Sequence, residues 1–125
     1  MSRILIYEPR RRSTDWSTTL AAEGHEVVLC NGREELLDAF AARRPDAMIY
    51  VLADLPFDLG VLSVVRRMAA TLPIILLGGP AGLETRRSVQ ELRPTYYGMF
   101  PLETAEVSEA LRGALEHRNG GRLAS

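Results

Sequence analysis

Few side chains in this sequence could do chemistry. Glu8 follows the apolar run RILIY and could contribute a carboxylate to a cation site, and Asp54 lies shortly after the apolar run AMIYV. Cys30 is the only cysteine, so an intramolecular disulfide and a thiolate metal cluster are both excluded. The two histidines, His25 and His117, lie far apart in the sequence. We therefore expect no bound metal ion and no cofactor.

Composition limits the class of protein. The chain has 125 residues, of which 46% are hydrophobic and 25% charged, and this suits one globular domain with its own core. No apolar run approaches the roughly 20 residues that cross a bilayer, so we expect a cytoplasmic protein without membrane contact. The formal net charge of -1 argues against direct nucleic-acid binding. Every cationic side chain other than histidine is arginine, because the sequence contains no lysine.

Short apolar runs and segments of helical periodicity alternate five times along the chain. The expected strands are residues 3–8, 25–30, 47–52, 74–77 and 95–100. Gly24 is expected to end the first helix, Asp58 to cap the third and Thr104 to cap the last. Strands that are apolar throughout indicate a parallel sheet covered by helices on both faces. We therefore predict an α/β, flavodoxin-like, doubly wound sheet with strand order 2-1-3-4-5, in which ligands bind beyond the carboxyl ends of the strands.

In this register the chain resembles the receiver domains of two-component response regulators, the CheY-like family. The resemblance covers residues 3–118. It rests on the strand ILIYE, on Pro45-Asp46 before the third strand, on the run PIILL from Pro73, and on Tyr97 ahead of Phe100-Pro101. Receivers hold Mg²⁺ with paired carboxylates and accept a phosphoryl group on an aspartate at the end of the third strand. The resemblance therefore implies a signal-transduction domain of the phosphorelay type.

The same resemblance places other residue types at the positions where receivers carry this chemistry. The carboxylate pair falls on Glu8 and Pro9, and the phosphate-accepting aspartate falls on Val51. Gly78 stands for the usual Ser or Thr, and Phe100 for the usual lysine. Together these replacements imply a pseudo-receiver that is not switched by aspartyl phosphorylation and is not an enzyme.

Two alternatives stay open. Asp54 could be a displaced phosphate acceptor, although an Asx-type turn before Pro56 is the interpretation we favour. A filled pocket at Val51 and Phe100 would support loss of phosphotransfer, and an inward-facing Asp54 would contradict it.

The second alternative concerns a cationic run after the first strand. Arg10, Arg11 and Arg12 could bind a phosphate-bearing ligand such as a nucleotide, because arginine forks suit phosphate oxygens. We favour a solvated charge run instead, since no glycine-rich phosphate motif accompanies these residues.

The remaining function is interaction with other proteins. In receivers the face made by the fourth helix, fifth strand and fifth helix is the usual partner or dimer surface. The residues expected on it are Arg86, Arg87, Tyr96, Tyr97 and Arg112. We expect a protein partner or a homodimer there. Residues 119–125 are expected to be a flexible tail or the start of a linker to a fused output domain.

Overall fold

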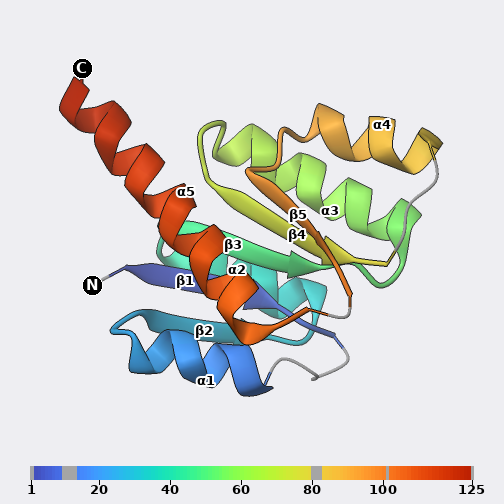
Figure 1. The fold of residues 1–125 in the computed structure, drawn as a ribbon. Coiled ribbons are helices and arrows are strands. Elements are labelled where there is room, and N and C mark those ends of the chain that lie inside the picture. The colour runs from blue at the N-terminus through green and yellow to red at the C-terminus, as the bar shows by residue number, and fades with distance from the viewer. Residues whose placement is uncertain (1, 10–13, 80–82, 101, 125) are drawn as a thin grey trace.

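Ten helices and strands alternate along the chain in the computed structural model, which describes residues 2–9, 14–79, 83–100 and 102–124 (Figure 1). The strands are β1 (Arg3–Tyr7), β2 (Glu26–Cys30), β3 (Ala47–Val51), β4 (Ile74–Gly78) and β5 (Tyr96–Met99). The helices are α1 (Thr14–Ala22), α2 (Arg33–Ala42), α3 (Leu55–Met68), α4 (Leu83–Glu91) and α5 (Thr104–Ala124).

The five strands form one sheet in the order β2-β1-β3-β4-β5, and all pairs are parallel. This confirms the predicted fold class and strand order. Each predicted strand agrees with the observed one to within one residue at either end. The agreement has a simple cause: each strand is an apolar run bounded by a turn former or a helix.

Side chains alternate between two apolar clusters, one on each face of the sheet. On β3, Met48 and Tyr50 pack in the cluster that α2, α3 and α4 cover, whereas Ile49 and Val51 pack in the cluster that α1 and α5 cover. Trp16 of α1 is buried in the second cluster and packs the first helix on the sheet. The sheet is therefore the middle layer of a three-layer domain (Figure 1).

Two helix boundaries illustrate how local sequence acts. The α1 helix ends at Ala22, and Gly24 has a φ of 98°, a left-handed conformation that glycine adopts without steric cost. The prediction that Asp58 caps the third helix was wrong, because α3 already begins at Leu55 with Asp54 as its N-cap. Pro56 explains the earlier start: it stands in the first turn, where a missing N–H leaves no hydrogen bond unmade.

The α5 helix extends to Ala124, beyond residue 118, where the sequence placed the end of the domain. A tail or linker role for residues 119–125 stays a prediction. Within the part of the chain that the structure describes, no helix is long and apolar enough to cross a membrane.

Candidate functional site at the carboxyl edge of the sheet

Four predicted site positions meet at the carboxyl edge of the sheet, because the ends of parallel strands lie side by side. They are Glu8 directly after β1, Val51 at the end of β3, Gly78 at the end of β4 and Phe100 directly after β5. The backbone N–H of Phe100 donates a hydrogen bond of 2.8 Å to the carbonyl of Gly78. The structure thus brings the predicted positions together at one edge, as the resemblance to receivers requires.

Val51 is an apolar core residue at this edge. Its side chain is only 4% exposed and packs in the cluster that contains Ile6, Ile49 and Leu77. An aliphatic side chain has no group that can attack phosphorus or bind a cation. The position to which the resemblance assigns the phosphate-accepting aspartate is therefore part of the core.

The first strand ends with a single carboxylate. Glu8 is buried, and its backbone N–H donates to the carbonyl of Cys30 at 3.0 Å. Pro9, the next residue, has no oxygen ligand in its side chain. Among the described residues, no three His, Cys, Asp or Glu side chains converge to hold a metal ion. A hard cation such as Mg²⁺ normally needs more oxygen ligands than one buried carboxylate supplies.

The hydroxyl of Tyr97 occupies the space above Gly78. A β-carbon placed on Gly78 would lie 3.0 Å from Tyr97 Oη and 3.3 Å from Leu52 Cδ1. The same hydroxyl donates a hydrogen bond of 3.0 Å to the carbonyl of Gly79. Burial raises the pKa of Tyr97, and the positive charge of Arg86 partly opposes that rise. The tyrosine thus takes the place that a Ser or Thr side chain at position 78 would fill.

Phe100 does not close the site. Its side chain is 41% exposed, whereas that of Val51 is buried. The pocket that both side chains were expected to fill is therefore filled by Val51 and not by Phe100. Phe100 supplies no positive charge at this edge.

Asp54 lies at the surface, three residues beyond Val51, and is the N-cap of α3. Its carboxylate makes no capping hydrogen bond. The turn before α3 is instead held by Asp58, whose Oδ2 accepts the backbone N–H groups of Ala53 at 2.8 Å and Asp54 at 2.9 Å. The side chain that stabilises this turn is therefore Asp58, and not Asp54 as the sequence suggested.

Asp58 also belongs to a buried polar group that sequence reasoning missed. The hydroxyl of Tyr50 donates a hydrogen bond of 2.6 Å to Asp58 Oδ1, and both side chains are buried. The rings of Tyr7 and Tyr50 stack with their centroids 4.5 Å apart. Burial, followed by the hydrogen bond to Asp58, raises the pKa of Tyr50 far above its ordinary value. Asp58 is thus engaged in three hydrogen bonds that hold the β3–α3 connection.

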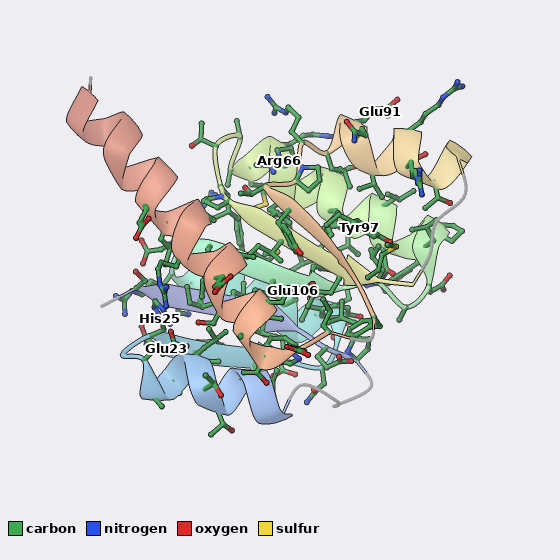
Figure 2. The ribbon with its side chains drawn as sticks, viewed as in Figure 1. Glu23, His25, Arg66, Glu91, Tyr97 and Glu106 are labelled. Atoms are coloured by element: carbon green, nitrogen blue, oxygen red, sulfur yellow. The ribbon has the colours of Figure 1, made fainter. Side chains whose placement is uncertain are left out.

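Arg66 is a second buried polar residue that the sequence did not reveal (Figure 2). Its Nε donates to the carbonyl of Leu92 and its Nη1 to the carbonyl of Leu72, both at 2.8 Å. Its Nη2 donates to the carbonyl of Arg93 at 3.1 Å, next to a backbone in the left-handed region with a φ of 53°. Burial, together with the charge of Arg93, lowers the pKa of Arg66. One guanidinium therefore ties the carboxyl ends of α3 and α4 together.

Arg10, Arg11 and Arg12 lie outside the described residues, so a phosphate-binding role for them stays a prediction.

The predicted interface residues divide between two surfaces. Arg86 and Arg87 are exposed on α4, and Tyr97 of β5 lies beside Arg86. Tyr96 turns toward α5, where its hydroxyl donates to a carboxylate oxygen of Glu106 at 3.1 Å. Arg112 is not brought together with the α4 arginines.

The side chain of Arg112 is directed toward α1. Its Nη2 lies 4.0 Å from the Glu23 carboxylate, at the end of α1, and that carboxylate also accepts a hydrogen bond from the hydroxyl of Ser108. This exposed ion pair joins α5 to α1 and contributes little stability by itself.

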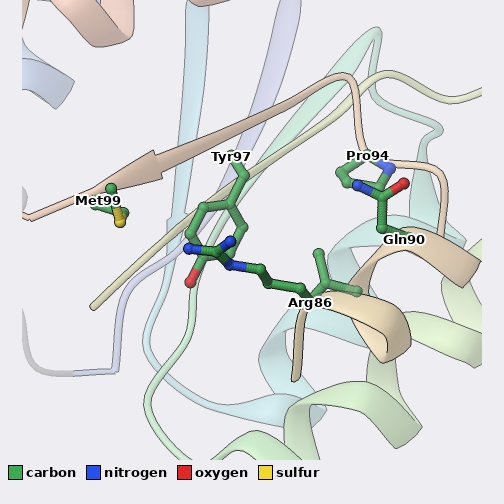
Figure 3. Close-up of a pocket in the computed structure, with 6 residues that line it drawn as sticks. Arg86, Gln90, Pro94, Tyr97 and Met99 are labelled. Atoms are coloured by element: carbon green, nitrogen blue, oxygen red, sulfur yellow. The ribbon is translucent and has the colours of Figure 1, made fainter. Parts of the chain in front are cut away.

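A pocket of about 270 Å³ opens between α4 and β5 (Figure 3). Its lining residues are Arg86, Val89, Gln90, Pro94, Tyr97 and Met99. Figure 3 shows Arg86 extending from α4 toward Tyr97, and Met99 is 52% exposed at the other end of β5. The face thus combines an apolar hollow with the long cationic side chain of Arg86, and this combination suits the binding of protein side chains.

Neither a protein-family profile nor a curated protein sequence matches this chain. Solved structures do match it. A CheY-like response regulator receiver domain of Methanospirillum hungatei JF-1 aligns with a TM-score of 0.86 at 20% identity, covering 97% of this chain and 98% of that one. Chemotaxis response regulator CheY4 of Vibrio cholerae aligns with a TM-score of 0.80 at 20% identity, covering 92% of this chain and 99% of CheY4.

NtrX of Brucella abortus, solved in complex with ATP, aligns with a TM-score of 0.83 at 20% identity. The alignment covers 98% of this chain and 29% of the NtrX chain. The fold of this protein is therefore the CheY-like fold of response regulator receiver domains, which in NtrX forms one part of a longer chain.

Proposed function

We propose that this chain is a pseudo-receiver: a receiver-like signalling domain of the two-component type that has lost phosphoacceptor chemistry and acts by binding other proteins. The observation that carries the proposal is Val51, buried in the apolar cluster at the position of the phosphate-accepting aspartate. Pro9, Gly78 and Phe100 support it, because each lacks the group that receivers use at the matching position.

Asp54 is a weak substitute for the missing acceptor. Its carboxylate lies at the surface beyond the strand end, and a Mg²⁺ ion there would have no lysine to help neutralise the phosphoryl oxygens, since the chain has none. The other acidic residue of this loop, Asp58, is already hydrogen-bonded to Tyr50 and to the backbone. The domain then has neither phosphotransfer nor another enzymatic activity.

The proposed working surface is the α4/β5/α5 face with its pocket at Arg86, Tyr97 and Met99. This surface would bind a protein partner or a second copy of the chain, and binding would not require phosphorylation. The proposed location is the cytoplasm, and the domain itself would not bind nucleic acid. The match to one part of NtrX is consistent with an output domain fused to this one in the native protein.

Incubation with acetyl phosphate and Mg²⁺, followed by intact-mass measurement, tests this function. We expect no phosphoryl adduct on the wild-type chain. A stable adduct that disappears in Asp54→Asn would instead identify Asp54 as a displaced acceptor and reject the pseudo-receiver proposal. A nucleotide-induced rise in melting temperature that is lost when Arg10, Arg11 and Arg12 are all changed to alanine would support the alternative of a small-molecule sensor.

A further inference from the structure

The outer side of α3 is an exposed apolar surface. Phe57, Val64 and Met68 are 37%, 42% and 43% exposed, and their spacing of seven and four residues places them on one side of the helix. Gly60 lies between them and is also exposed. The neighbouring helices differ, because their exposed residues include the charged side chains Arg33, Glu34, Glu35 and Asp38 in α2 and Arg86, Arg87 and Glu91 in α4.

Scattered apolar side chains are common on protein surfaces, but a continuous helical stripe is not. The guanidinium of Arg33 lies 4.6 Å from the centroid of the Phe57 ring and covers part of it from the α2 side. The ring nevertheless keeps more than a third of its surface exposed. The stripe thus remains available to a partner.

Opposite charges lie near the two ends of this stripe, Asp54 at one end and Arg67 at the other, and Arg33 and Arg44 border it on the α2 side. Asp54 is the N-cap of α3 and Arg67 lies in its last turn, and both are exposed. Among the described residues, neither forms a salt bridge. Asp54 lies three residues before Phe57, and Arg67 lies three residues after Val64. The midpoint between Phe57 and Val64 and the midpoint between Asp54 and Arg67 both fall between Gly60 and Val61.

Gly60 has no local reason to be glycine. A β-carbon there would meet no atom within 4 Å, and its φ is not in the left-handed region. Glycine inside a helix lowers helix stability relative to alanine. On an outer face, however, it allows a second backbone to approach closely.

We propose that the outer face of α3 binds a second copy of this chain, with the two α3 helices antiparallel across a two-fold axis near Gly60. In this arrangement Phe57 of one copy faces Val64 of the other. Asp54 of one copy faces Arg67 of the other, twice by symmetry. The stripe is therefore complementary to itself, which is the requirement of a two-fold interface.

No residue of α3 lines the pocket of the proposed function, so the two proposals can fail independently. A 14-residue helix is about 21 Å long, and its stripe is smaller than the roughly 800 Å² per partner of a standard interface. We accordingly expect a weak dimer, with a dissociation constant in the micromolar range or above.

Sedimentation equilibrium of the full chain over a wide concentration range tests the proposal. We expect a concentration-dependent dimer that weakens at least about tenfold in Asp54→Arg and in Arg67→Asp, because each substitution brings like charges together. The double variant Asp54→Arg/Arg67→Asp exchanges the two charges and should restore the dimer. Asp38→Arg, an exposed position of α2 that belongs to neither proposed surface, is the matched control and should leave dimerisation unchanged.

Three results would overturn the proposal: a monomer at every concentration, a dimer indifferent to both single substitutions, or a double variant that stays as weak as the singles. Circular dichroism should confirm that each variant is folded, as expected for exposed positions. If a charge variant does not fold, Val64→Gln takes its place. It should weaken the dimer, and an unchanged dimer would again reject the α3 contact.

Discussion

Tyr97 Oη lies 3.0 Å from the point where residue 78 would carry a β-carbon, and residue 78 is glycine. The tyrosine and the glycine therefore depend on each other: the hydroxyl reaches the carbonyl of Gly79 only because position 78 has no side chain. They form a single packed arrangement.

Introducing a side chain at position 78 should be destabilising. Gly78→Ala places a methyl group against the Tyr97 hydroxyl and against Leu52, whose Cδ1 would be 3.3 Å away. Crowding of this kind costs about 1–3 kcal/mol. The free energy of unfolding from urea titration should fall by that amount.

A double-mutant cycle separates this contact from other effects. In a Tyr97→Phe background the hydroxyl is absent, so Gly78→Ala should cost less. Gly79→Ala serves as the control, since its β-carbon would meet no atom within 4 Å. Equal costs of Gly78→Ala in both backgrounds would show that the hydroxyl does not occupy this space.

The Tyr50–Asp58 hydrogen bond predicts a pH dependence of stability at the alkaline end. Burial and Asp58 raise the pKa of Tyr50 in the folded protein above the value of about 10 in the unfolded chain. The neutral phenol is thus favoured by folding, and its contribution is fully present below pH 10 and lost as the pH rises further. Urea titrations should show stability falling above about pH 10.

Tyr50→Phe is the comparison for this pH effect. It removes the hydrogen bond and should cost about 1–2 kcal/mol at neutral pH. Because the phenol is gone, stability should then decline less steeply in alkali. A variant with the same alkaline slope as the wild type would show that another group is responsible, such as Tyr7, whose pKa is also raised by burial.

Arg66 should be one of the most sensitive charged residues to truncation. Arg66→Ala removes the donor that satisfies carbonyls after both α3 and α4 and leaves a cavity, so we expect a loss of about 2–4 kcal/mol. Arg67→Ala is the adjacent control: its side chain is exposed, and at concentrations where the chain is monomeric its effect should stay within about 0.5 kcal/mol. Similar unfolding midpoints for the two variants would contradict the assigned role of Arg66.

The sequence predicted the strands and the positions at their carboxyl ends because both depend on local pattern. Apolar runs bounded by proline or glycine define β1 to β5, and counting from Pro45 places Val51 at the end of β3. The order of the strands follows from the handedness of parallel crossovers. These features need no knowledge of side-chain conformation.

The side-chain arrangement could not be predicted in the same way. Arginine is rarely buried, and the carbonyls that receive Arg66 come from segments up to 27 residues away. Aspartate is a common N-cap residue, but Pro56 allows α3 to begin at Leu55, so Asp58 lies inside the first turn of the helix. The sequence predicts Arg112 on the α4/β5/α5 face, whereas in the structure its side chain reaches Glu23 at the end of α1.

The central claim, that the phosphoacceptor site is lost, is tested most directly by a phosphoryl analogue that needs no turnover. Beryllofluoride binds a receptive aspartate in the presence of Mg²⁺, and amide NMR shifts report it residue by residue. We predict no saturable shifts at Gly78, Gly79 and Tyr97 when beryllofluoride and Mg²⁺ are added together. Saturable shifts at these residues and at Asp54, abolished in Asp54→Asn, would contradict the account.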